Sequence, residues 1–280
     1  MDKLLLVDGS NLLFQMFFGM PARIVGKNSK PIQGVLGFVG ALLKIIKMTE
    51  PTHIAVLLDG EHENGRSLLD PAYKSNRADY GELPEEENPF SQLPAVYAAL
   101  DYLGIKCSEA DSCEADDVIA GYALTCGKYC EVVISSFDSD FFQLISPRVS
   151  VLRYRGKDTV LCTPKWFEEK FGITPAQYAD FKALTGDSAD AIKGAEQVGP
   201  KTAAALLREF GTLQDLLQNA EAVKKPSVRE SIRKNADRLR INYRLIKLTN
   251  AAPLPFSLDE LAYRPSEITT TEVLRGIGLK

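Results

Sequence analysis

The chain has 280 residues, of which 45% are hydrophobic and 25% charged, a globular composition with room for one large or two small domains. No window approaches the roughly 18–20 apolar residues of a membrane span, and the apolar start is too short for a signal peptide. Five Cys without a CxxC spacing and only two His argue against a disulfide scaffold or a zinc site and favour the reducing cytosol. The net charge is −4, yet residues 193–250 hold 12 Lys and Arg against six Asp and Glu.

Short apolar runs alternate with helix-like spacing over the first 165 residues. This alternation predicts an α/β fold with a central, mostly parallel sheet flanked by helices. Asp8, Asp59 and Asp138 each follow an expected strand within a few residues, and ligands of parallel sheets bind beyond the carboxyl ends of the strands. The expected strands span residues 4–7, 53–58, 132–136 and 149–152, and the expected helices span residues 35–46, 91–103 and 117–124.

The pattern becomes helical from about residue 174. We therefore expect an α/β domain over residues 1–173 and a helical domain over residues 174–280. Residues 79–90 hold five acids, two Pro and no base, which predicts an exposed insertion. The helices expected in the second domain span residues 175–184, 202–210, 213–220 and 227–248.

Nine acids are candidate metal ligands. Each alone has an ordinary structural explanation, because Asp-Gly turns and acidic helix caps are common. Gathered at one sheet edge they would repel each other strongly unless cations lay among them. Carboxylates without His or Cys suit Mg²⁺ or Mn²⁺, and two such ions roughly 3.5–4 Å apart form the clamp used for phosphodiester hydrolysis. The nine acids are Asp8, Asp59, Glu114, Asp116, Asp117, Asp138, Asp140, Asp187 and Asp190.

The charge outside these nine acids is basic, with 28 acids against 33 bases, as expected of a protein that binds nucleic acid. Gly194 and Gly199 would let the backbone approach a phosphate at the start of a helix, and Lys201 and Thr202 would add contacts. A plain helix–helix turn is the alternative. The basic residues between positions 224 and 247 fit a duplex-binding face and a solvated helix face equally well.

A second basic stretch follows the strand that ends at Asp59. Arg66 and Lys74 lie in position to neutralise a phosphate, and Tyr73 could stack on a base. An ordinary charged helix start is the alternative, and it would be favoured if the carboxylates were absent.

Five motifs follow one another along the chain: VDGSN (7–11), YKSNR (73–77), CEADDVIA (113–120), SSFDSD (135–140) and KALTGDSADAIKGAEQVGPKTA (182–203). In this order they resemble the 5′ nuclease superfamily of flap endonucleases and the 5′→3′ exonuclease domain of bacterial DNA polymerase I. The resemblance implies a PIN-like catalytic domain with an arch at about residues 70–92, followed by a helix–three-turn–helix (SAM-like) DNA-binding module. Because no polymerase segment follows Lys280, we expect a stand-alone bacterial member that is cytoplasmic and nucleoid-associated.

The resemblance also implies roles for single residues. Lys74 matches a lysine that contacts the reacting phosphate, Arg77 matches a nearby arginine, and Lys182 matches a lysine close to the metal site. The glycine turn matches a loop that binds the duplex backbone, often with a K⁺ ion. By this resemblance, three of the nine acids match family ligands of the second metal, namely Asp117, Asp187 and Asp190. The other six match family ligands of the first metal.

Two features depart from the family pattern. Position 15 usually carries Arg, and Gln15 leaves a positive contact missing unless Arg23 replaces it. The segment after Arg77 is acidic where family arches are commonly basic or apolar. This predicts weak threading of a single-stranded 5′ end, or a loop that faces away from the DNA.

We therefore predict a metal-dependent 5′→3′ exonuclease and structure-specific flap endonuclease that acts as a monomer on DNA with a flap, nick or 5′ end, in replication or repair. RNA:DNA hybrids are a further candidate substrate. The principal alternative is a DNA-structure-binding protein on the same scaffold, with weak or no catalysis. A small-phosphate hydrolase with an Asp138-Ser139-Asp140 nucleophile would need neither the helical module nor the basic final third. An RNA-cutting PIN-type nuclease is the remaining alternative.

Overall fold

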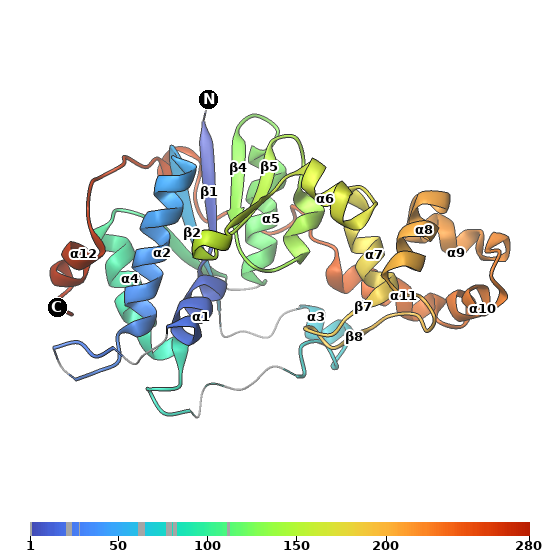
Figure 1. Ribbon diagram of the computed structural model, residues 1–280, viewed down its shortest axis with the longest axis horizontal. Helices are drawn as coiled ribbons and strands as arrows, with labels where there is room; N and C mark the ends of the chain where they lie inside the picture. Colours follow the sequence, from blue (N-terminus) through green and yellow to red (C-terminus); the bar gives the residue numbers. More distant parts are fainter. Residues whose placement is uncertain are drawn as a thin grey trace.

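A six-stranded sheet forms the centre of the molecule, in the order β3-β2-β1-β4-β5-β6 (Figure 1). The neighbouring pairs from β3 to β5 run parallel, and β6 pairs antiparallel with β5. The computed structural model describes residues 2–20, 24–27, 29–60, 65–76, 80, 83–110 and 113–280. The strands are β1 (Lys3–Asp8), β2 (His53–Asp59), β3 (Lys106–Ala110), β4 (Glu131–Ser135), β5 (Val149–Arg153) and β6 (Val160–Cys162).

Helices cover both faces of the sheet, because successive side chains of a strand point to opposite faces. Leu5 and Val7 of β1 pack into one apolar cluster, and Leu4 and Leu6 pack into another on the opposite face. The first cluster is closed by α1 (Gly9–Gly19), α2 (Gln33–Thr49), α4 (Leu93–Tyr102) and α12 (Thr270–Gly276), and the second by α5 (Ala115–Cys126).

The helical half of the chain, residues 164–246 with α6 to α11, extends to one side of the sheet, and the chain then returns so that α12 packs on the sheet beside α2 and α4 (Figure 1). The core of this helical half is continuous with the α5 face of the sheet. The expected helix over residues 227–248 is interrupted at Asn235, and a short antiparallel ladder, not expected from the sequence, precedes α8. The elements are α6 (Pro164–Phe171), α7 (Tyr178–Thr185), β7 (Gly186–Asp187), β8 (Ile192–Lys193), α8 (Pro200–Phe210), α9 (Leu213–Gln218), α10 (Pro226–Lys234) and α11 (Ala236–Ile246).

The predicted fold class, an α/β domain with a mostly parallel sheet and a helical module, is confirmed. The edge strands β3 and β6 were missed because their sequences, KCSEA and VLC, lack a clear strand pattern. The short helix α3 (Gly65–Leu69) lies just before the expected arch, and a 3₁₀ turn at Pro89–Gln92 lies at its end. Arg23, Arg77, Asp79 and Glu82 lie outside the described residues.

None of the described helices is long and apolar enough to cross a membrane. All five Cys are free thiols, as the sequence predicted.

Candidate active site

The carboxyl edge of the sheet carries the acids that the sequence placed there. Asp8 ends β1 and Asp59 ends β2, and these two strands are hydrogen-bonded neighbours. Asp138 follows β4 on the other side of β1, and Asp116 lies in the first turn of α5. The site is therefore assembled by the parallel strand order and by the direction of one helix.

Asp8 is held in place from two sides. Its Oδ1 accepts a hydrogen bond from the backbone N–H of Asn11 at 3.0 Å, which caps α1. The hydroxyl of Ser136 donates to its Oδ2 at 2.7 Å, and the backbone N–H of Asp138 donates to the Ser136 oxygen at 2.9 Å. Asn11 and Ser136 thus orient carboxylates at this edge. Both lie in recognised motifs, although the sequence reasoning assigned them no role.

Four acids at this edge repel one another. Burial, together with the charges of Asp59 and Asp138, raises the pKa of Asp8 to about 7. Burial and the charges of Asp138, Asp8 and Asp59 also raise the pKa of Asp116 well above its usual value. These carboxylates therefore lie where a cation would relieve both burial and repulsion.

A second group of three acids lies beside the first. Carboxylate oxygens of Asp140, Asp187 and Asp190 come within 4.8 Å of one another. The buried ammonium of Lys182 contacts both Asp140 and Asp187. Burial raises the pKa of Asp140 to about 7, even though Lys182 acts in the opposite direction. At Asp187 burial acts to raise the pKa, but Lys182 together with backbone hydrogen bonds from Ala189 and Asp190 holds it below its usual value.

The last two acids, Glu114 and Asp117, pair with Arg66. One guanidinium nitrogen of Arg66 lies 2.6 Å from Glu114 Oε2, and the other lies 2.6 Å from Asp117 Oδ1. Glu114 also receives the Lys74 ammonium at 2.5 Å and the Tyr73 hydroxyl at 3.1 Å. Burial alone would raise the pKa of Glu114, but Lys74 and Arg66 hold it below its usual value.

The donor set at this edge fits a divalent cation. Seven carboxylates at this edge offer hard oxygen donors, three of them within 4.8 Å of one another, and no described His lies among them. The raised pKa values of Asp8, Asp116 and Asp140 are the signature of carboxylates without enough countercharge. Glu114 and Asp117 differ, because their charges are met by protein cations.

Comparisons with known proteins agree with this site. The family model for the 5′-3′ exonuclease N-terminal resolvase-like domain matches residues 3–172, and that for its C-terminal SAM fold matches residues 173–269. The chain belongs to the 5′-3′ exonuclease family. It is 37% identical over 259 residues to DNA polymerase I of Thermus thermophilus, covering 92% of this chain and 30% of that protein. It is 37% identical over 272 residues to DNA polymerase I of Rhizobium leguminosarum, covering 94% and 26%. The chain thus spans less than a third of these two relatives.

Solved structures support the same family. T5 5′-exonuclease, solved with bound divalent zinc ions, superposes with a TM-score of 0.72 at 25% identity, over 87% of this chain and 89% of that one. The catalytic core of Rad2, solved with a DNA substrate, shares the fold with a TM-score of 0.58 at 16% identity, over 91% and 83% of the two chains.

The two glycines of the turn before α8 have different surroundings in the structure. A side chain at Gly194 would meet the backbone of Thr185 and Leu184 at 2.3–2.4 Å, so this glycine permits close packing against the end of α7. Gly199 precedes α8 and has open space around it. Lys201 is exposed and Thr202 is partly exposed, so both can reach a ligand at that helix start.

Two residues predicted to contact DNA, Tyr73 and Arg66, have partners within the protein, and so does Gln15. Tyr73 is buried, with 8% of the residue exposed, so its ring cannot stack on an incoming base without moving. Arg66 points at Glu114 and Asp117 and not at open solvent. The side chain of Gln15, where the family usually has Arg, donates to the carbonyl of Tyr154 at 2.8 Å. The segment at Tyr73 and Arg66 therefore orders the carboxylates from within the protein.

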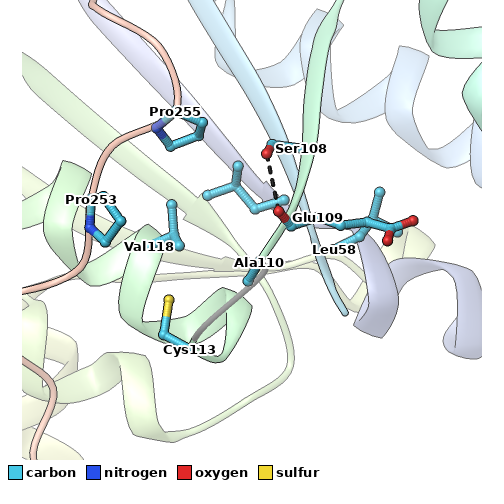
Figure 2. Close-up of a pocket in the computed structure, with 9 residues that line it drawn as sticks. Leu58, Ser108, Glu109, Ala110, Cys113, Val118, Pro253 and Pro255 are labelled. Atoms are coloured by element: carbon cyan, nitrogen blue, oxygen red, sulfur yellow. Dashed lines mark hydrogen bonds between the residues drawn. The ribbon is translucent and has the colours of Figure 1, made fainter. Parts of the chain in front are cut away.

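A separate pocket of about 250 Å³ lies beside the edge strand β3. Figure 2 shows Pro253 and Pro255 on one side of it and Ser108 to Ala110 on the other. Cys113 lines this pocket and is partly exposed. The lining is largely apolar and is distinct from the carboxylate edge.

Proposed function

We propose that this chain is a divalent-metal-dependent 5′→3′ exonuclease and structure-specific 5′ flap endonuclease that hydrolyses DNA phosphodiesters in replication or repair. The observation that carries the proposal is the convergence of seven carboxylates, three of them with raised pKa values, at one sheet edge beside two lysines. A site with this excess of buried negative charge favours cations and then a phosphodiester. Polymerase activity of the longer relatives forms no part of the proposal.

Two ions are proposed, Mg²⁺ or Mn²⁺, because seven of the nine acids form two groups. Asp140, Asp187 and Asp190 would hold one ion, and Asp8, Asp59, Asp116 and Asp138 would hold the other. Bound there, the ions would supply Lewis-acid activation of water and stabilisation of the leaving oxygen. Glu114 and Asp117 would act on this site from outside, through Arg66 and Lys74.

The residues of the chain have separate tasks in this reaction. Lys74 is proposed to contact the scissile phosphate, because its ammonium lies at the rim of the site with 15% of its side chain exposed. Lys182 is deeper, between Asp140 and Asp187, and would orient these two carboxylates. Arg77 is proposed as a second cation near the phosphate on the strength of the YKSNR motif alone.

DNA with a 5′ flap, nick or 5′ end is the proposed substrate, and RNA:DNA hybrid is a secondary one. Within residues 174–280, the turn around Gly194 and Gly199 would bind duplex DNA, together with Lys201 and Thr202. A K⁺ ion at that turn and a monomeric state are part of the proposal. The solved complex of Rad2 with a DNA substrate supports DNA as the substrate class, since the two proteins share a fold.

The test is cleavage of 5′-labelled flap, nicked and single-stranded DNA in Mg²⁺, Mn²⁺ or EDTA, each in K⁺ and in Na⁺. We expect cuts at the flap junction that require the divalent ion, and loss of turnover in Asp138→Asn with binding retained. Asp2→Asn is the matched control, since Asp2 is exposed and precedes β1, at the edge of the sheet opposite the carboxylates. Full turnover of Asp138→Asn would refute the metal assignment.

A DNA-structure-binding protein without catalysis is the second candidate, and one observation favours it. The amide of Gln15 is committed to a backbone carbonyl, so α1 offers no positive charge at that position. Binding of the flap without any cut in either metal would support this candidate.

A further inference from the structure

Asp70 and Arg238 form an ion pair between the two halves of the chain. Their Oδ2 and guanidinium nitrogen lie 2.6 Å apart, with 11% and 34% of the side chains exposed. Asp70 follows α3, and Arg238 lies in the first turns of α11. Figure 1 shows α3 beside α11 and the β7–β8 ladder. Neither residue belongs to the nine candidate ligands.

Asp70 organises the turn that carries Lys74. Its other carboxylate oxygen accepts the backbone N–H of Ala72 at 3.0 Å, and its carbonyl accepts the N–H of Tyr73 at 2.9 Å. Lys74 then adopts a left-handed backbone conformation with φ of 56°, and its N–H donates to the carbonyl of Asp190 at 3.0 Å. A non-glycine residue keeps that conformation only where its surroundings enforce it. The position of the Lys74 ammonium therefore depends on the turn that Asp70 holds.

Arg238 lies on a helix that also contacts the glycine turn. One turn further along α11, the amide of the fully buried Asn242 donates to the carbonyls of Lys193 at 2.8 Å and Ala183 at 3.1 Å. Lys193 directly precedes Gly194. A single rigid element thus contacts the proposed duplex-binding turn at one point and the Lys74 turn at another.

We propose that the Asp70–Arg238 ion pair is a positioning device that ties the placement of Lys74 to the seating of the helical half on duplex DNA. Without the pair, the turn over residues 70–76 loses its link to α11, and the Lys74 ammonium is no longer held against the site. Asp70 and Arg238 touch no reacting atom and act through Lys74. The inference rests on the proposed nuclease function.

The first test measures single-turnover cleavage of a saturating flap substrate by Arg238→Gln and Asp70→Asn, with binding measured separately in Ca²⁺. We expect the cleavage rate to fall by roughly 10–100-fold, the scale of a misplaced catalytic group, while binding changes little. Asp237→Asn is the matched control, because it breaks an exposed ion pair on the same helix. A wild-type chain that never cuts refutes the nuclease proposal itself. A wild type that cuts beside variants with unchanged rates refutes only the ion-pair proposal.

The second test separates positioning from a purely structural role. If Arg238 acts through Lys74, Arg238→Gln should slow cleavage by no more than about 2-fold once Lys74→Ala is present, because coupled sites are non-additive. Full additivity of the two substitutions would overturn the proposal. A salt-dependent loss of binding by Arg238→Gln would also overturn it, since Arg238 would then be a phosphate contact. If Arg238→Gln does not fold, Arg238→Met enters the same cycle with the same criteria.

Discussion

Arg66 is predicted to be a major source of stability for the metal-free protein, and its removal gives a sharp test. Its guanidinium makes contacts of 2.6, 2.9 and 2.6 Å to Glu114 and Asp117, and 12% of its side chain is exposed. Arg66→Gln keeps some of the volume but leaves two largely buried carboxylates short of a counter-charge. Breaking a buried pair in this way costs about 3–5 kcal/mol.

The lower end of that range applies, because Glu114 retains Lys74 and Tyr73 as partners. We expect the free energy of unfolding to fall by about 3 kcal/mol, which corresponds to a decrease in Tm of roughly 6–12 °C. The matched control is Arg233→Gln, which breaks an ion pair to Glu221 whose side chains are 55% and 72% exposed. Exposed pairs contribute about 0–1 kcal/mol, so this variant should melt close to the wild type.

The pH dependence follows from Glu114. Because its pKa is lowered in the folded state, its contribution to stability is present above its unfolded pKa and is lost as the pH falls through the folded pKa. The deficit of Arg66→Gln should therefore be large at pH 7 and shrink only as the pH falls below about 4.5. Urea titrations in EDTA at several pH values measure this. Equal stability of Arg66→Gln and Arg233→Gln at pH 7 would refute the reasoning.

Three further predictions concern the metal site and α1. Lys182→Met leaves Asp140 and Asp187 without their shared cation, so the metal-free Tm should fall and added Mg²⁺ should recover part of the loss, as calorimetry would measure. Asp8 and Asp140 have folded pKa values of about 7, above their unfolded values, so their ionisation destabilises the metal-free fold as the pH rises from about 4 to 7. The increase in Tm that Mg²⁺ produces should consequently be larger at pH 8 than at pH 5.5, and an unchanged increase would contradict this. Gln15→Arg should raise flap cleavage by adding a positive charge on α1; a loss would mean that the contact of Gln15 with Tyr154 is needed.

The sequence predicted the acidic sheet edge because parallel strands place their carboxyl ends together. Asp8 and Asp59 follow apolar runs that could only be buried strands, and β1 and β2 indeed pair with Asp8 opposite Leu57. The signal was strong since each strand reads as a continuous apolar run. Polar edge strands carry no such signal, and β3 was therefore missed.

The partners of the cations could not be predicted in the same way. Arg66 lies 48 and 51 positions from Glu114 and Asp117 along the chain, and no periodicity links residues at that distance. A basic residue near an acidic site fits a phosphate contact and an internal ion pair equally well on sequence grounds. The choice depends on burial, and burial of Tyr73 and Arg66 follows from how α3 packs against α5 and α11. The need for glycine at position 194 could not be predicted either, because it comes from the close approach of the turn to the backbone of α7.

The internal ion pairs also explain how one site can hold two groups of carboxylates with opposite behaviour. Arg66 and Lys74 lower the pKa of Glu114, and Lys182 lowers that of Asp187, so these acids stay charged with protein partners alone. Asp8 and Asp116, without a comparable described cation in contact, have raised pKa values. The charge of Glu114 is met within the protein and holds structure, whereas the charge of Asp8 and Asp116 is available for binding cations. Asp140 and Asp187 share Lys182 and remain proposed metal ligands. The division between Glu114 and the proposed ligands therefore follows from where Arg66 and Lys74 lie, and removing either cation should make Glu114 a competing ligand.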